Sequence, residues 1–212
     1  MPLLENQCFC SYNLFMKINY QLQLDQYLKT LTTRPRLALH SCCGPCSSYV
    51  IEYLSEFFDI TVFFYNPNVH PEPEYLHRLQ EQKRLCDILK VPCVDCDYNP
   101  GSFFEFVRGL EKEREGGARC EKCFRLRLEY TAKKAKADGF DLFATTLTVS
   151  PHKNAQLINA IGYDIASKIG IEWLPSDFKK RSGYLRSIRL SEQYELYRQN
   201  YCGCIYSKNT QD

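Results

Sequence analysis

Short apolar runs alternate along this chain with longer stretches in which apolar residues are spaced by three and four. The short runs are typical of buried strands, and the longer stretches are typical of helices. Strands are predicted over residues 36–41, 60–65, 91–98, 141–147 and 171–175. Helices are predicted over residues 11–31, 47–58, 74–90, 103–114, 119–137, 150–170 and 184–199. This alternation predicts an α/β fold built on a parallel sheet.

In a parallel sheet, the ligand site lies at the carboxyl ends of the strands. Three predicted strands end in loops with unusual composition: CCGPC at 42–46, NPNVHPEPE at 66–74 and TVSPHKN at 148–154. We expect these loops to meet at one edge of the sheet and to form the mouth of a cleft. Residues 34–212 are predicted to form one domain that ends in a helical, cysteine-bearing segment, and residues 1–33 are predicted to be an extension.

Composition places this domain among globular proteins of the cytoplasm. The chain has 212 residues with a net charge of +2 and no apolar run long enough for a membrane helix. The amino terminus does not resemble a secretory signal. The outlier is the cysteine content of 12 residues. In a reducing compartment, clustered cysteines indicate metal binding or redox chemistry rather than structural disulfides.

Cys120 and Cys123 form a CxxC pair at the start of a predicted helix, which places both thiols on one helix face. The helix amino terminus, together with Arg119, Lys122 and Arg125, is expected to favour the thiolate form. This pair is a candidate metal half-site.

Cys42 and Cys43 are adjacent, so their side chains diverge and are poorly placed to bind one small tetrahedral ion. A cubane cluster offers separate iron corners, and two pairs give the four thiolates that a [4Fe–4S] cluster needs. A zinc site uses the same number of ligands. The adjacent pair favours iron–sulfur, with Cys42, Cys43, Cys120 and Cys123 as ligands.

The remaining cysteines divide into two groups. Cys46 and the terminal CxC pair, Cys202 and Cys204, are expected to hold a second metal, or the CxC pair is expected to form a redox-active disulfide. An inert tail is the alternative for the CxC pair. Structural roles are expected for Cys86, Cys93 and Cys96, whereas Cys8 and Cys10 precede the predicted domain.

Six motifs together resemble a known family. They are, in chain order, LHSCCGPCSS, YNPNVHPEPEY with Arg78, RCEKCFRLRLEYTA, ATTLTVSPHKN, SDFKKRSGY and YCGC. Their order resembles that of the cobalamin-independent, cysteine-rich epoxyqueuosine reductases of bacteria. The resemblance runs from about residue 36 to residue 207.

The resemblance implies that the epoxide of epoxyqueuosine, at the wobble position of tRNA, is reduced to the alkene of queuosine. It implies a [4Fe–4S] cluster on the four cysteines named above, and Cys202 and Cys204 as redox or second-metal cysteines. Some relatives have Asp at the position of Cys46, which fits a metal ligand for one additional iron. An electron donor is required, and the sequence does not identify it.

The fold implied by the resemblance is the adenine-nucleotide α-hydrolase, or PP-loop, type. Enzymes of that type bind pyrophosphate in an SGGxDS turn after the first strand, where this chain has SCCGPCS. Without those glycines and the aspartate, we do not expect the chain to use ATP.

Opening an epoxide requires a proton donor or a Lewis acid at the departing oxygen. An iron held by Cys46, Cys202 and Cys204 is one hypothesis for the Lewis acid. His70, His152 and Tyr184 are the main candidates for proton donors, and Tyr65 and His40 are further ones. The alternative for His40, which lies in the first predicted strand, is a packed structural role. His77 is expected on a solvated helix face.

Two basic segments are candidates for binding RNA. The run at 178–190 contains Lys179, Lys180, Arg181 and Arg186 without any acidic residue. The predicted helix at 119–137 adds a second set of cations: Arg125, Arg127, Lys133, Lys134 and Lys136. Such cations are typical of phosphate contacts, although solvated surfaces also carry them. A smaller polar set in the second loop is expected to contact the nucleoside or simply solvent: Asn66, Asn68, Glu72 and Glu74.

Three other functions remain open from the sequence alone. A zinc-stabilised tRNA-binding protein would use the same cysteines without catalysis. A PP-loop-derived tRNA sulfur-transfer protein would need the nucleotide turn that is missing here. A thiol–disulfide oxidoreductase would use a CxxC pair but would leave the adjacent Cys42–Cys43 pair without a role.

Overall fold

A computed structural model of the chain describes residues 17–208. Its centre is a sheet of five strands: β1 (Arg36–His40), β2 (Asp59–Phe64), β3 (Cys93–Asp95), β4 (Leu142–Thr145) and β5 (Glu172–Trp173). Every strand pair is parallel, and the strand order is β3-β2-β1-β4-β5. The predicted α/β fold with a parallel sheet is therefore confirmed.

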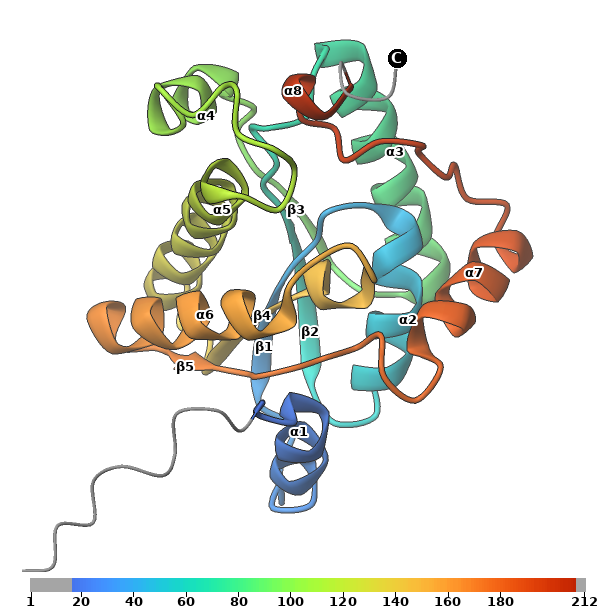
Figure 1. The fold of residues 1–212 in the computed structure, drawn as a ribbon. Coiled ribbons are helices and arrows are strands. Elements are labelled where there is room, and N and C mark those ends of the chain that lie inside the picture. Colours follow the sequence, from blue (N-terminus) through green and yellow to red (C-terminus); the bar gives the residue numbers. More distant parts are fainter. Residues whose placement is uncertain (1–16, 209–212) are drawn as a thin grey trace, which may run out of the picture.

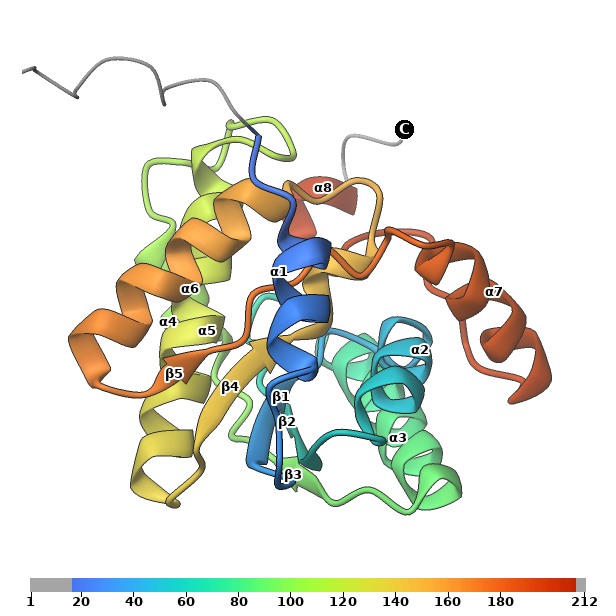
Figure 2. The same cartoon turned by 90° about the horizontal axis from the view of Figure 1, so that it is seen from below.

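Helices cover both faces of this sheet. They are α1 (Tyr20–Leu28), α2 (Gly44–Leu54), α3 (Glu72–Leu89), α4 (Pro100–Phe106), α5 (Ala118–Ala137), α6 (Ala155–Ile169), α7 (Gly183–Gln193) and α8 (Ile205–Lys208). A 3₁₀ turn, η1 (Thr146–Val149), follows β4. Figures 1 and 2 show α5 and α6 on one side of the sheet, and α2, α3 and α7 on the other. No helix among residues 17–208 is long and apolar enough to span a membrane.

Alternation along the strands supplies a core to each layer of helices. Leu37 and Leu39 of β1 point towards α1 and α2, together with Val62 of β2. Ala38 and the neighbouring Phe63 point the other way, towards α5 and α6. The three central strands, β1, β2 and β4, are thus buried on both faces, which explains their continuous apolar runs.

Helix α1, which belongs to the predicted extension, packs into the first of these cores. Leu24 and Leu28 are buried there, and Asp25 forms an ion pair with Arg181 near α7. The described part of the extension is therefore integrated with the sheet. Residues 1–16, which include Cys8 and Cys10, lie outside the described part of the chain.

Several predicted helix bounds differ from the structure: the helix predicted over 11–31 begins at Tyr20, and the one predicted over 103–114 is α4. Two further differences affect the site. The CCGPC segment is not a free turn, because α2 begins at Gly44 and contains Cys46 in its first turn. Conversely, α6 begins at Ala155 rather than at Pro151. Asn154 caps α6 by accepting hydrogen bonds from the amides of the second and third helical residues. Residues 150–154 therefore form a loop.

The helix predicted over 184–199 is also shorter than expected, because α7 ends at Gln193. Glu195 has a φ of +51°, a left-handed conformation that stops a helix. The chain beyond it returns across the carboxyl edge of the sheet towards α8, which brings the terminal cysteines to the loops that follow β1 and β4 (Figure 1).

Gly162 in α6 allows this helix to lie directly on the indole of Trp173. A Cβ atom at position 162 would be 2.2 Å from Trp173 Cε2. Because the indole also packs edge-on against Phe143 and is fully buried, it has little room to move. We therefore expect Gly162→Ala to lower the free energy of unfolding by about 1–3 kcal/mol, measured by urea denaturation.

Gly44→Ala is the matched control, since its new Cβ would meet its nearest neighbour at an ordinary 3.8 Å. It is expected to change stability by less than about 0.5 kcal/mol. Equal losses in both variants would contradict the close approach of α6 to Trp173.

Candidate redox site

Three thiols meet where β1 passes into α2. The Sγ atoms of Cys42, Cys43 and Cys46 all lie within 4.8 Å of one another, and those of Cys42 and Cys43 are 3.8 Å apart. The expectation that the adjacent side chains of Cys42 and Cys43 diverge was therefore wrong. They converge because Cys43 is extended, with φ at −175°, just before the helix begins. Among residues 17–208, this is the one group of histidine, cysteine or acidic side chains compact enough to hold a metal ion.

The surroundings of this trio favour one thiolate. Hydrogen bonds from Cys43 and Cys46 hold the pKa of the Cys42 thiol well below its usual range, and the Arg127 charge lowers it further. The same contact with Cys42 raises the pKa of Cys43 to about 12 and also raises that of Cys46. The hydroxyl of Thr146 donates to Cys42 Sγ at 3.5 Å. Cys42 is therefore the most anionic thiol of the three.

Four further thiols line a small cavity of about 60 Å³ beside this trio: Cys120, Cys123, Cys202 and Cys204. The first two come from the start of α5, as predicted, and the last two come from the segment before α8. Burial raises the pKa of Cys120, of Cys204 and of Cys123, the last to about 11. Without further positive charge, these three thiols favour the neutral form.

Two of the three cations predicted to activate the CxxC pair are engaged elsewhere, which corrects that expectation for them. Lys122 lies over the Phe106 ring, and Arg125 pairs with an acidic residue of α6. Arg119 is different. It donates to the backbone carbonyls of Glu111 and Glu113 through one nitrogen, and its other two guanidinium nitrogens are buried without a hydrogen-bond partner among residues 17–208. Burial has the larger effect on the pKa of Cys120 and raises it, whereas the Arg119 charge lowers it.

Two other cations, Arg127 and Lys153, connect the two groups of thiols. The Arg127 guanidinium is 2% exposed and donates to Cys123 Sγ at 3.6 Å. Burial opposes its charge, but Cys123 and Cys42 together keep its pKa raised. The Lys153 ammonium donates to Cys202 Sγ at 3.7 Å, and Cys202, followed by Cys42, raises its pKa. Neither cation has a carboxylate partner among residues 17–208.

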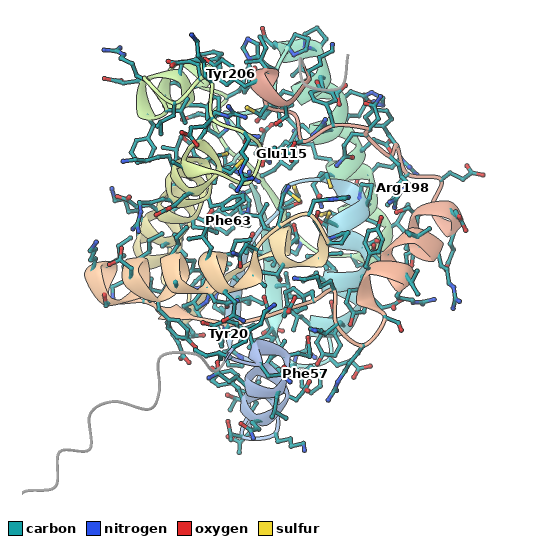
Figure 3. All side chains as sticks on the ribbon, viewed as in Figure 1. Tyr20, Phe57, Phe63, Glu115, Arg198 and Tyr206 are labelled. Carbon is teal, nitrogen blue, oxygen red and sulfur yellow. The ribbon has the colours of Figure 1, made fainter. Side chains whose placement is uncertain are left out.

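Above the cysteines lies a cavity of about 550 Å³, which opens at the carboxyl edge of the sheet. The three predicted loops all contribute to it, through Cys42 and Cys46, through Asn66 and Asn68, and through residues 150–153. The predicted gathering of these loops is therefore confirmed. Two more lining residues are labelled in Figure 3: Glu115 from the segment before α5, and Arg198 from the segment after α7.

A buried arginine holds the terminal CxC segment in place. Arg78 of α3 donates to the carbonyl oxygens of Tyr201 and Cys202, each at 3.2 Å. Its Nε also forms an ion pair with Glu74 at 2.7 Å, and its guanidinium lies over the Tyr201 ring. The chain is further fixed where the His70 amide donates to Gly203 O at 2.8 Å. These bonds place Cys202 on the wall shared by both cavities.

The candidate proton donors occupy three different environments. His152 and Tyr184 line the large cavity. His70 lines neither of the two cavities and packs edge-on against Phe104. His40 is completely buried, and desolvation followed by the Arg127 charge lowers its pKa to about 3, so it is a neutral packed residue.

Three of the four cations predicted to contact RNA are paired within the protein. Lys179 pairs with Asp177, Arg181 with Asp25 and Arg186 with Glu52. On the basic helix, four of the five cations are similarly engaged: Arg125 with Asp164, Lys133 with Glu129, Lys134 with Asp138 and Lys136 with the carbonyl of Gly170. The fifth is the buried Arg127, so the expectation of a surface role for it was wrong.

The other predicted structural cysteines lie away from the two thiol groups. Cys86 and Cys96 are buried, and Cys93 is partly buried at the start of β3. His77 is exposed on α3 and stacks against Tyr197 with ring centroids 4.1 Å apart. Sequence reasoning did not assign a role to Lys153 or to the buried position of Arg127. The adjacency of Lys153 to His152 in the third loop was the only available signal for it.

The chain belongs to the class of α/β proteins with a parallel sheet, and it has a thiol-lined cavity at the carboxyl edge of that sheet. The solved structure of the U34-tRNA thiolase NcsA from Methanococcus maripaludis with its [4Fe–4S] cluster superposes with a TM-score of 0.56. The likeness covers 89% of this chain and 67% of that one, at 13% identity. At this identity the comparison concerns the fold alone.

The sequence matches the model of the family "Epoxyqueuosine reductase QueH" over residues 37–210, and the chain belongs to this family. Epoxyqueuosine reductase QueH of Streptococcus pyogenes serotype M1 is 46% identical, across 92% of this chain and 80% of the relative. The relative of the same name from Staphylococcus epidermidis is 42% identical, across 90% and 85%. That from Thermotoga maritima is 34% identical, across 80% and 88%.

The role of Arg78 as an anchor can be tested by hydrogen exchange. Arg78→Met removes the donors that hold residues 201 and 202, so the segment should open more often. We expect the amide of His70, which is bonded to Gly203 O, to exchange about tenfold faster or more. Peptide-resolved mass spectrometry provides the measurement.

Arg84→Met is the control on the same helix. Arg84 donates to the carbonyls of Tyr194 and Glu195, earlier in the same returning segment. This variant should accelerate exchange near residue 195 and leave His70 unchanged. An unchanged His70 amide in Arg78→Met would show that other contacts hold the CxC segment.

Proposed function

We propose that this protein is a cobalamin-independent epoxyqueuosine reductase of the cytoplasm, which converts epoxyqueuosine to queuosine at the wobble position of tRNA. Membership of the QueH family supports the reaction. The observation that carries the proposal is a pair of cations, the buried Arg127 and the half-buried Lys153, which lie between two groups of thiols at the floor of a large cavity.

This arrangement fits an anionic iron–sulfur cluster. A buried guanidinium without a counter-ion is strongly unfavourable, and here the nearest groups able to carry negative charge are thiols. We propose Cys42, Cys43, Cys120 and Cys123 as the ligands of a [4Fe–4S] cluster, which would supply electrons one at a time at low potential. Cys46 lies close enough to the first pair to act as an alternative ligand.

Two roles are proposed for Cys202 and Cys204, as ligands of a second metal or as a redox-active pair. Cys202 borders both cavities, whereas Cys204 borders only the small one. Cys46 lies in the separate trio with Cys42 and Cys43. An additional iron held by Cys46, Cys202 and Cys204 is one proposal, and a redox-active pair of Cys202 and Cys204 is the other.

The reaction requires two electrons from an external donor and two protons, and it breaks both C–O bonds of the epoxide to give the alkene and water. The chain places several proton-bearing groups around the space that the epoxide would occupy. His152 lines both cavities, and Tyr184 lines the larger one. We propose these two as proton donors, with His70, which lies in the loop that follows β2, in a supporting position.

The substrate must leave the stack of the anticodon loop to reach this cavity. A volume of about 550 Å³ suits one extruded nucleoside. We propose that phosphates are contacted by the 178–190 segment, through Lys180 and through the exposed sides of Lys179, Arg181 and Arg186. Because these last three are already ion-paired, their contribution to RNA affinity is expected to be modest.

The activity can be tested with tRNA that carries epoxyqueuosine, under anaerobic conditions and with a chemical electron donor. After nuclease digestion, mass spectrometry should show loss of one oxygen mass from the modified nucleoside. We expect Cys42→Ser and Cys120→Ser each to lower bound iron and sulfide and to reduce turnover at least 100-fold.

Cys93→Ser is the control, since Cys93 lines neither the large nor the small cavity. It should keep both iron and activity. Zinc without sulfide in the purified protein, or sulfur transfer to the tRNA, would contradict the proposal in favour of a zinc-stabilised tRNA-binding protein or a PP-loop-derived tRNA sulfur-transfer protein.

The requirement of Arg127 for a negative partner gives a separate prediction about stability. Arg127→Met removes the buried positive charge, so the gain in unfolding free energy on loading iron and sulfide should fall by about 1–3 kcal/mol. Denaturant unfolding of the apo and loaded forms gives this difference.

Arg125→Met provides the control on the same helix, because Arg125 faces α6 and pairs there with Asp164. It should leave the gain on loading unchanged. An undiminished gain in Arg127→Met would contradict the electrostatic role of that guanidinium.

A further inference from the structure

Three residues that line the large cavity each have a side-chain amide oxygen without a hydrogen-bond partner. These oxygens belong to Asn66, Asn68 and Gln199, and each of them is buried. Asn66 and Asn68 are only 1% and 2% exposed as whole residues. A buried acceptor without a donor costs about 1–3 kcal/mol. Two such residues separated by a single proline therefore require a physical reason.

Asn159, a buried asparagine with a structural role, provides a comparison for the hydrogen bonding of Asn66 and Asn68. Its Oδ1 accepts hydrogen bonds from Trp173 Nε1 and from the Ser176 amide. Its Nδ2 donates to the carbonyls of Ala155 and Ser176. Every hydrogen-bonding atom of that side chain is therefore used. The two cavity asparagines differ from it in their unused oxygens.

The orientation of Asn66 is fixed by the protein. Its Nδ2 donates to the carbonyl of Ser41 at 2.8 Å, and flipping the amide would place two oxygens against each other. The free atom is therefore an oxygen, and it can be satisfied only by a hydrogen-bond donor. The cations of the cavity do not serve it, because Arg127 and Lys153 donate towards sulfur and Arg78 donates to backbone carbonyls.

The position of Asn66 also indicates which part of a ligand it meets. Ser41 directly precedes Cys42, so the amide of Asn66 is tied to the loop that carries the cysteine trio. A group that contacts Asn66 therefore lies close to the redox centre, where the reacting ring must be, rather than at the distant edge of the base. The hydroxyl groups beside the epoxide on the cyclopentane ring are donors of the required kind.

We propose that Asn66 and Asn68 form a specificity site that accepts hydrogen bonds from these ring hydroxyls. The inference rests on the proposed function, and it assigns the two asparagines to recognition of the substrate ring. Glu72 and Glu74 are not part of this site: Glu72 is exposed, and Glu74 is engaged by Arg78 and by the hydroxyl of Tyr197. The site would reject a tRNA whose modified base lacks the hydroxylated ring.

Binding without turnover tests this site. The iron-loaded protein is titrated, without an electron donor, against tRNA bearing epoxyqueuosine and against tRNA bearing the same deazaguanine with only an aminomethyl group. The ratio of the two dissociation constants measures recognition of the ring. We expect Asn66→Leu and Asn68→Leu each to reduce this ratio about tenfold, with little change for the tRNA without the ring.

Two acidic variants separate recognition from packing. Asn68→Asp keeps acceptor oxygens in the cavity and is expected to retain most of the ratio. Asn66→Asp places an oxygen against the Ser41 carbonyl and is expected to lose it. Gln80→Leu, at an exposed position of α3, is the control for the change from amide to apolar side chain.

The possible failures are distinguishable. If the wild-type protein shows no preference for the ring-bearing tRNA, the proposed function itself fails. If the wild type shows the preference and both leucine variants keep it while remaining folded by circular dichroism, the assignment of the asparagines is overturned. Loss of bound iron in the leucine variants would also overturn it and would place the amide oxygens at the metal.

Discussion

The site depends on the interaction of two cations, the buried Arg127 and the half-buried Lys153, with the thiols around them. Arg127 and Lys153 have sulfur, not carboxylate, as their nearest potential anionic partner. In a low-dielectric interior, this charge is stable only if the sulfur atoms carry negative charge in return. The space between α2 and α5 therefore favours an anionic group, because both cations need negative charge close to them.

The parallel sheet provides the geometry for this interaction. Successive strands end at the same edge, so the loops after β1, β2 and β4 converge there although they are far apart in sequence. The segment that carries Cys202 is brought to the same edge in a different way. The chain after α7 returns over this edge, and Arg78 holds it by two carbonyl oxygens. Cys202 consequently faces Lys153 across the cavity floor rather than lying in a free terminus.

The cavity above the thiols is lined by two chemically different sets of groups. One set contains the cations and proton-bearing groups near the sulfur atoms, including Lys153 and His152. The other set contains two asparagines, Asn66 and Asn68, whose amide oxygens no group among residues 17–208 satisfies. A hydroxylated, epoxide-bearing ring has donors for the second set and an oxygen acceptor for the first. This complementarity links the electrostatics of the thiol-lined floor to the proposed substrate.

The sequence alone determined the parallel α/β fold, because continuous apolar runs can be buried only in a sheet covered on both faces. It also determined that the CCGPC and TVSPHKN loops meet, since strand direction fixes the edge at which they lie. Only the tertiary structure decided which charges matter. Arg127 and Lys134 are both cations on α5. Arg127 lies on the side of the helix that faces β1 and is therefore buried against thiols, whereas Lys134 pairs with Asp138 at the surface. Similarly, NPN in a loop is as compatible with solvent as with a ligand. Only the three-dimensional positions of the neighbouring donors show that the amide oxygens of Asn66 and Asn68 have no hydrogen-bond partner.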